Sequence, residues 1–223
     1  YANNSGIAHG AITTALYPWT GSSQPGQPSG QQRMHIYTPP NYDRNRRYPV
    51  LYLLGGSGEL ASTWNIDGRA GFIADNLIAE GKALPMIIAM PNNQVVHRGD
   101  PRHTELTFSL FEKELRQQII PVVEKAYSTQ PGPRGRAIAG LSMGGRHAQL
   151  VGFKSLDLFR SFGILSAGDP ESEKSTPEFL NDPAINAKVD YLFVGLGTHE
   201  NQPTNRSVVF HQILDKHHVA HEY

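Results

Sequence analysis

The pentapeptide at residues 140–144 contains the residue types needed for nucleophilic attack on a carbonyl group. It is Gly-Leu-Ser-Met-Gly, with Ser142 at its centre. A buried-strand pattern ending near Ala139 precedes it, and a helical pattern over residues 145–153 follows it. A Gly-x-Ser-x-Gly motif in this context exposes the serine hydroxyl on a strained turn, at a helix N-terminus that favours a developing anion. The motif therefore predicts Ser142 as the nucleophile, and a chance match among 22 glycines is the alternative.

Acyl transfer at Ser142 also needs two backbone donors that bind the oxyanion of the tetrahedral intermediate. The N–H of Met143, directly after the nucleophile, is expected to be the first donor. The second is expected from the run Gly55-Gly56-Ser57-Gly58, which follows an apolar strand pattern, with the N–H of Ser57 as the donor. An ordinary glycine turn is the alternative interpretation of this run.

The elements that position these residues are predicted from the spacing of apolar side chains. Short apolar runs with little alternation are typical of strands buried on both faces of a parallel sheet. They occupy residues 50–54, 86–90, 136–139, 162–165 and 191–194, and an alternating run at 33–38 predicts a half-buried strand near the edge. Helical patterns lie between them at 70–79, 108–126, 145–153 and 209–214, and Pro121 predicts a kink or break in the second. This order predicts an α/β fold with a mostly parallel sheet and helices on both faces.

The composition limits the classes of function. A single catalytic domain over residues 1–223 is expected from the length and from an apolar fraction of 39%. Twenty basic residues balance twenty acidic ones, so neither nucleic acid nor a membrane is expected as a partner. The chain has no cysteine, which excludes a thiol nucleophile. It begins with Tyr1 and has no apolar leader, so a processed, secreted or periplasmic protein is expected.

The pentapeptide at 140–144 and the glycine-rich run at 55–58 are part of a wider similarity. The chain resembles the esterase D type of α/β hydrolase, and within it the feruloyl esterase and acetyl xylan esterase group of carbohydrate esterases. The resemblance is carried by residues 48–59, Trp64, and residues 73–82, 85–91 and 137–145, and it extends over nearly the whole chain. It implies an α/β-hydrolase fold and hydrolysis of plant polysaccharide esters by a Ser-His-acid triad, without a cofactor. One position departs from the family, because Gly55 replaces the usual histidine before the glycine of the oxyanion loop.

The resemblance places the triad acid after a late strand. The segment Gly-Thr-His-Glu ending at Glu200 is similar to the family's Gly-Thr-x-Asp segment, which puts Glu200 at the acid position. A glutamate can orient the imidazole and stabilise its positive charge as an aspartate does. Asp169, which follows the preceding strand, is the competing candidate.

The general base has no clear candidate in the sequence. In the family it lies beyond one further strand, which residues 219–223 resemble, so the base is expected past Tyr223 and the domain is expected to lack its extreme C-terminal segment. His199, beside the acid, is a substitute hypothesis. The remaining C-terminal histidines are interpreted as exposed or partly buried surface residues; they are His211, His217, His218 and His221. No metal is expected at the cluster of His217, His218 and His221, because it has no carboxylate partner at ligand spacing and no cysteine.

Two residues are candidates for binding the substrate. Trp64 follows the oxyanion loop and is expected either to wall the acyl or sugar pocket or to pack that loop. His97 belongs to a polar loop after the strand at 86–90, at the carboxyl end of the sheet, where ligands bind in such folds. An ordinary charged surface is the alternative for this loop.

The sequence leaves two classes of function open. The first is a serine carboxylesterase, feruloyl esterase-like, acting on a small ester or a polysaccharide ester; an S-formylglutathione hydrolase-like or other small-ester hydrolase is its alternative. The second is a non-catalytic carbohydrate-binding or truncated protein that keeps the fold without the base.

Overall fold

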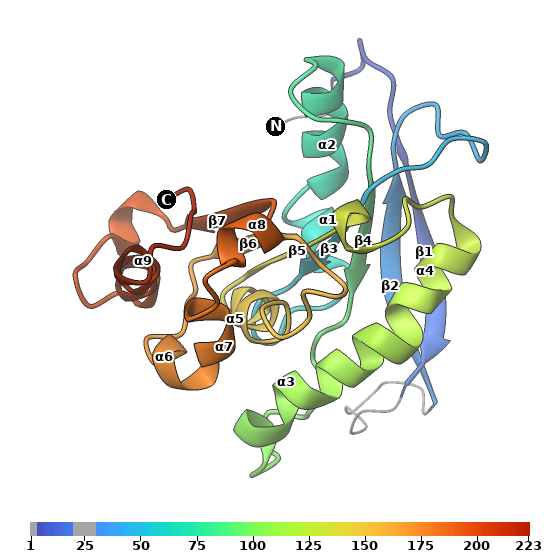
Figure 1. Cartoon of the computed structure of the whole chain (residues 1–223). Coiled ribbons are helices and arrows are strands. Elements are labelled where there is room, and N and C mark those ends of the chain that lie inside the picture. Colours follow the sequence, from blue (N-terminus) through green and yellow to red (C-terminus); the bar gives the residue numbers. More distant parts are fainter. Residues whose placement is uncertain (1–3, 20–29) are drawn as a thin grey trace.

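The computed structural model describes residues 4–19 and 30–223, and seven strands of this part form one mixed sheet (Figure 1). Along the sheet the order is β1-β2-β4-β3-β5-β6-β7. The strands are β1 (Ala11–Pro18), β2 (Gln31–Thr38), β3 (Val50–Leu54), β4 (Ile87–Pro91), β5 (Arg136–Leu141), β6 (Ser161–Leu165) and β7 (Tyr191–Gly195). β1 and β2 pair antiparallel with their neighbours, and the strands from β4 to β7 are parallel. The predicted mostly parallel sheet is confirmed.

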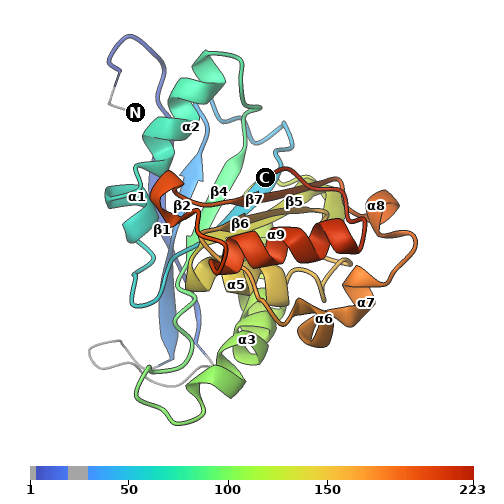
Figure 2. The ribbon, with the colours of Figure 1, turned by 90° about the vertical axis from the view of Figure 1, so that its left-hand side faces the viewer.

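Helices cover both faces of the sheet, as Figure 2 shows. The α-helices are α1 (Thr63–Ile66), α2 (Ala70–Ala79), α3 (His103–Glu114), α4 (Ile120–Ala126), α5 (Met143–Leu150), α6 (Ser172–Ser175), α7 (Pro177–Leu180), α8 (Ile185–Lys188) and α9 (Arg206–Lys216). A π-helical turn, η1 (Leu115–Ile119), and two 3-10 turns, η2 (Pro133–Gly135) and η3 (Thr198–Glu200), complete the set. α3, α5 and α9 pack into the larger core on one face, and α2 packs into a smaller core on the other.

The strand β3 shows how the sequence builds the two cores. Its side chains alternate between the faces, as the pleat of a strand requires. Val50, Tyr52 and Leu54 belong to the larger core, whereas Leu53 lies in the core under α2 with Leu51 packed against it. Because both faces of β3 are covered, the residues that point to each face are apolar, and the strand appears in the sequence as an apolar run without polar alternation.

The long helical segment 103–126 does not break at Pro121. α3, η1 and α4 follow one another directly, and Pro121 is the second residue of α4. Proline has no N–H for the helical ladder, and its ring clashes with the carbonyl one turn earlier. The wider π turn η1 precedes the proline and accommodates this clash, so the expected kink takes the form of a π turn inside a continuous helix.

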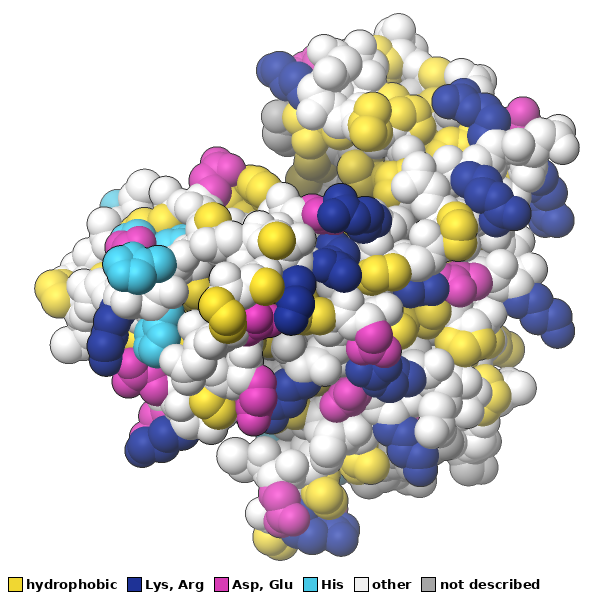
Figure 3. All heavy atoms as spheres, viewed as in Figure 1, with side chains coloured by type: hydrophobic (Ala, Val, Ile, Leu, Met, Phe, Trp, Pro, Cys, Tyr) yellow, Lys and Arg dark blue, Asp and Glu magenta, His cyan; other side chains and the backbone are white. Residues whose placement is uncertain are grey.

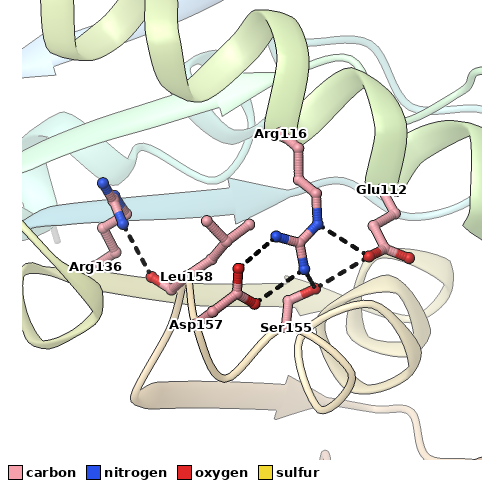
Figure 4. Close-up of polar contacts among 6 residues, drawn as sticks. All are labelled: Glu112, Arg116, Arg136, Ser155, Asp157 and Leu158. Atoms are coloured by element: carbon pink, nitrogen blue, oxygen red, sulfur yellow. Dashed lines mark hydrogen bonds and ion pairs between the residues drawn. The ribbon is translucent and has the colours of Figure 1, made fainter.

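Arg116 in η1 ties this long helix to the loop after α5 (Figure 4). Its guanidinium donates to Asp157 at 2.6 Å, to Ser155 at 2.9 Å and to Glu112 at 3.0 Å. The hydrogen bonds from Arg116 hold the pKa of Asp157 below its usual range. Both partners are partly exposed, so the pair contributes at most about 1 kcal/mol to stability, and its main effect is to fix the position of the helix.

Asp75 of α2 is a buried acceptor that joins three segments of the chain. Its side chain is 4% exposed and accepts hydrogen bonds from the Tyr37 hydroxyl at 2.7 Å and from the Gly10 N–H at 2.8 Å. His9 Nδ1 lies 2.9 Å from the same carboxylate. Burial and this carboxylate raise the pKa of Tyr37, so the hydroxyl remains a donor. The N-terminal segment is thereby attached to α2 and β2.

We predict that Asp75→Ala lowers the free energy of unfolding by about 2–4 kcal/mol, because the buried Tyr37 hydroxyl and the partly buried Gly10 N–H lose their acceptor. Urea unfolding followed by circular dichroism measures the difference. Asp67→Ala, an exposed position at the end of α1, is the control and is expected to change the free energy by less than about 0.5 kcal/mol. Equal effects of the two substitutions would contradict a structural role for Asp75.

Candidate active site

Ser142 lies at the turn between β5 and α5, near the middle of the parallel part of the sheet. Its φ of 54° and ψ of −114° place it in a backbone region that residues with a side chain rarely adopt. The N–H of Ser142 donates to the Leu165 carbonyl of β6 at 2.8 Å, which holds the strained turn against the neighbouring strand. The Ser142 side chain is exposed, and Met143 is the first residue of α5, where backbone N–H groups have no acceptor within the helix.

Gly144 allows the predicted oxyanion loop, residues 55–58, to approach Ser142, the predicted nucleophile. A Cβ at residue 144 would lie 2.4 Å from the carbonyl oxygen of Leu54 and 2.6 Å from that of Gly55. The backbone after β3 therefore packs directly on the first turn of α5. This contact explains why residue 144 is a glycine. It also brings the N–H groups of Met143 and Ser57, the two predicted oxyanion donors, close to each other.

Three successive carbonyl groups of the oxyanion loop each accept a hydrogen bond from a side chain. Trp64 Nε1–H donates to the Leu54 carbonyl, Asn93 Nδ2–H to that of Gly55 and Gln94 Nε2–H to that of Gly56, each at 2.9 Å. These bonds fix the orientation of the peptide planes on one side of Ser57.

Gln94 also fixes the loop on the other side of Ser57. Its Oε1 accepts the N–H of Gly58 at 3.0 Å, so one carboxamide spans the loop from Gly56 to Gly58. The N–H of Gly56 donates to Glu59 at 2.5 Å. Within residues 4–19 and 30–223 no hydrogen bond takes up the N–H of Ser57, which is the state expected of an oxyanion donor.

A cavity of about 250 Å³ contains the predicted nucleophile and both predicted donors. Its wall is polar and cationic on several sides and aromatic at Phe108. The lining residues are Ser57, His103, Thr104, Thr107, Phe108, Ser142, Met143, Arg146, Ser166, Ala167 and Arg206. The guanidinium of Arg146 lies 5.3 Å from the ring centroid of Phe108. A cavity of this size is suited to an acyl group rather than to a polymer segment.

Glu200 is connected to this cavity through Ser166. The Ser166 hydroxyl, which lines the cavity, donates to the Glu200 carboxylate at 2.7 Å, and the Gly197 N–H donates to it at 3.0 Å. The hydrogen bond from Ser166 lowers the pKa of Glu200, and the hydrogen bond from Gly197 lowers it further. The carboxylate therefore stays ionised at a lower pH than that of an ordinary glutamate. Asp169 instead accepts the N–H of Glu171 within its own loop and does not line the cavity.

His147 lies beneath the nucleophile turn and is fully buried. Its Nδ1 is 2.9 Å from the Met143 carbonyl, and its ring contacts those of Phe108 and Phe111. Burial lowers the pKa of His147 to about 4. The imidazole is therefore neutral at physiological pH and supports the turn without placing a charge under it.

The family model described as "Putative esterase" matches residues 27–215. The chain belongs to this esterase family. The resemblance and the prediction of a carboxylic ester hydrolase are thereby confirmed.

The curated relatives of this esterase include two proteins named as endo-1,4-beta-xylanases. An endo-1,4-beta-xylanase/feruloyl esterase of Xylanibacter ruminicola is 36% identical over 214 residues, which are 93% of this chain and 28% of that protein. Endo-1,4-beta-xylanase Y of Acetivibrio thermocellus is 29% identical over 187 residues, which are 76% of this chain and 17% of that protein. The chain thus spans less than a third of either curated relative.

A solved structure with the same fold is a CE1 ferulic acid esterase from Anaeromyces mucronatus. It superposes with a TM-score of 0.78 at 22% identity, covering 99% of this chain and 84% of that one. The predicted α/β-hydrolase fold is confirmed by this likeness.

Neither residue predicted to bind substrate lines the Ser142 cavity of the esterase. The Trp64 indole holds the Leu54 carbonyl, and its ring faces a separate apolar hollow under α2. His97 is exposed, and its Nδ1 accepts the N–H of Gly99. The polar loop that contains His97 leads into α3, and His103, the first residue of that helix, does line the cavity.

The sequence interpretation of this esterase also missed Gln94. A signal was present, because residues 92–94 are Asn-Asn-Gln, three carboxamides directly after a strand that ends at the carboxyl edge of the sheet. A carboxamide can donate and accept hydrogen bonds without carrying a charge, so at this position it can hold backbone N–H and C=O groups in place.

The C-terminal histidines of the esterase differ in their surroundings. His199 is exposed on η3 and does not line the Ser142 cavity. His217 lies 2.9 Å from Glu173, and His218 is exposed. His211 and His221 approach Asp215, so the expectation that no carboxylate stands at ligand spacing is wrong. Asp215 lies outside residues 217–221, and the helix places it one turn after His211.

We predict that Gln94→Ala lowers kcat by about 10–100-fold with little change in KM, because the freed loop no longer presents the Ser57 N–H to the oxyanion. Steady-state kinetics on methyl ferulate measures both constants. Asn201→Ala, an exposed position after η3, is the control for a change of surface polarity. A rise in KM at unchanged kcat would place Gln94 in substrate binding instead.

We predict further that Glu200→Gln lowers kcat/KM by at least about 100-fold, because a neutral amide no longer stabilises the imidazolium. Asp169→Asn is expected to keep kcat/KM within a few-fold of the parent, since its carboxylate serves only its own loop. The same kinetic assay compares the two variants. The opposite ranking would make Asp169 the triad acid.

Proposed function

We propose that this chain is a serine carboxylesterase that releases feruloyl-type acids from esters of plant cell-wall polysaccharides. The observation that carries the proposal is the single cavity shared by Ser142, Met143 and Ser57. The name of the Xylanibacter ruminicola relative, an endo-1,4-beta-xylanase/feruloyl esterase, supports the substrate class. Membership of the esterase family favours an enzyme over a non-catalytic module.

In the proposed mechanism the Ser142 hydroxyl attacks the ester carbonyl while a histidine accepts its proton. The negative charge that develops on the carbonyl oxygen is bound by the N–H groups of Met143 and Ser57. The tetrahedral intermediate then expels the sugar hydroxyl, which takes the proton from the imidazolium. Water, deprotonated by the same imidazole, hydrolyses the acyl-enzyme, and Glu200 orients the base through both steps.

We place the general base after Tyr223, in keeping with the resemblance. Glu222 pairs with Phe193 in parallel, through its N–H to the Leu192 carbonyl at 2.9 Å and its carbonyl to the Val194 N–H at 2.8 Å. Chain that continued in this direction would run toward the end of β7, where the Glu200 loop begins. His103 is the alternative base, because it lines the cavity with Ser142.

The cavity wall suits an aromatic acid with oxygen substituents. Phe108 offers a ring face against which a hydroxycinnamoyl ring can stack, and Arg146 and Arg206 offer donors for phenol or methoxy oxygens. We propose a secreted or periplasmic location for this activity, since cell-wall polysaccharides are too large to enter a cell. No helix within the described ranges has the length and apolarity needed to cross a bilayer.

The experiment uses the full-length protein, with any residues that follow Tyr223, and compares kcat/KM on methyl ferulate, acetylated xylan and S-formylglutathione. Methyl ferulate is expected to react fastest, and Ser142→Ala is expected to lower its kcat/KM by about 10⁴-fold or more. Ser109→Ala, an exposed serine on α3, is the control and should leave the rate unchanged. A faster thioester reaction would assign the enzyme to the S-formylglutathione class, and an active Ser142→Ala variant would refute the nucleophile.

The same assay on His103→Ala distinguishes the two proposed bases. Loss of activity comparable to that of Ser142→Ala would make His103 the base. A change of less than about tenfold supports a base that follows Tyr223.

A further inference from the structure

Three potential metal ligands meet at the C-terminal end of α9, away from the Ser142 cavity. His211 and Asp215 lie one turn apart on the helix, and His221 comes from the segment that follows it. One ligand atom from each lies within 4.8 Å of the other two. Figure 3 shows histidine side chains gathered on the end of the molecule that α9 occupies. We propose that His211, Asp215 and His221 bind a divalent transition-metal ion of the zinc type.

The fold fixes the approach of His221 to the helix. After α9 the chain reverses at His218, whose φ is 54°, and the N–H of Val219 donates to the Leu214 carbonyl. Glu222 then pairs with β7, and its side chain accepts from the Tyr191 hydroxyl. Because side chains alternate along an extended segment, His221 and Tyr223 both point away from the side of Glu222, and both contact His211 of α9.

Tyr223 holds the ring of His211 in place. The two rings are stacked, with centroids 4.0 Å apart and an interplanar angle of 5°. The ring of His221 lies edge-on to that of His211 at 5.0 Å. Both imidazoles are therefore positioned by packing before any ion binds, which reduces the entropy lost on binding.

The hydrogen bonds of His221 leave a lone pair directed at the cluster. Its Nδ1–H donates to the Val219 carbonyl at 2.8 Å, and a carbonyl can only accept, so Nε2 carries no proton in the neutral ring. A backbone carbonyl that receives the second ring N–H is the usual support of a metal-bound histidine. The side chain of His221 is 4% exposed, so this lone pair has little access to water.

The two imidazoles of the cluster already face each other through ring nitrogens. His221 Nε2 is 2.7 Å from His211 Nδ1, which donates to it in this arrangement. An ion bound by both nitrogens replaces that hydrogen bond, and the His211 ring then carries its proton on Nε2, 3.4 Å from the Asp215 carboxylate. Glu173 pairs with Lys216 and His217 instead, so it does not belong to the cluster.

The donor set favours zinc or a similar ion over calcium or magnesium, because two of the three ligands are imidazole nitrogens. Zinc bound by two imidazoles holds their nitrogens roughly 3.0–3.4 Å apart. The present separation of 2.7 Å between His211 Nδ1 and His221 Nε2 needs only a small rotation of either ring to reach it. Asp215 is 62% exposed, so it can turn inward and water can complete the coordination.

Such an ion would fasten the last residues of the described chain to α9. Arg206 at the start of the same helix lines the Ser142 cavity, so the site would also steady one wall of that cavity. The inference does not depend on the proposed function, because it concerns binding and stability rather than the reaction.

The test uses tag-free protein freed of metal with a chelator, to which zinc chloride is added. Calorimetry is expected to give one zinc per chain, and the Tm is expected to rise by several degrees. His211→Ala and Asp215→Asn should abolish both effects, and these partly exposed positions allow folding even if His221→Ala does not. His217→Gln and His218→Gln are the matched histidine controls and should keep both. An absent zinc response, or one that survives in His211→Ala, would overturn the proposal.

Discussion

The packing of the β3 loop on the first turn of α5 is the contact on which the site depends. The carbonyl groups of Leu54 and Gly55 come so close to Gly144 that a single methyl group would not fit between them. Only this approach lets the N–H of Ser57 and the N–H of Met143 face one cavity. The hydrogen bonds from Trp64, Asn93 and Gln94 hold the loop in that position, and residues near the start of α3 line the same cavity.

The backbone around Ser57 and Ser142 is held mainly by neutral groups. Carboxamides and an indole bind the carbonyl groups of residues 54–56, Glu59 accepts the N–H of Gly56, and His147 beneath the turn is uncharged because burial lowers its pKa. The charged side chains are two arginines in the cavity wall and the Glu200 carboxylate, held through Ser166. In the proposed mechanism, preorganised dipoles and these charges act together on the charge that develops in the transition state.

Local patterns in the sequence were enough to predict the strands from β2 to β7, the turn at Ser142 and the carboxyl edge of the sheet. The apolar runs at 50–54 and 191–194 became β3 and β7, because a strand covered on both faces leaves a local signature. Gln94, in contrast, acts on a loop 36 residues away. Only the strand order, which places β4 beside β3, makes these segments neighbours. The meeting of His211 with His221 likewise depends on a reversal and on pairing with β7, which no spacing along the chain reveals.

The hollow under α2 has a consequence for the behaviour of the protein in solution. About 480 Å³ in volume, it is lined almost entirely by apolar side chains from β3 to β7, and Tyr191 at its margin is half exposed. Figure 3 shows hydrophobic side chains around the part of the surface near α2. The formal charges of the chain sum to zero at pH 7, so electrostatic repulsion between molecules is weak there. Colloidal stability of the isolated chain should therefore be lowest near neutral pH and should improve on either side of it, as molecules of like charge keep these apolar surfaces apart.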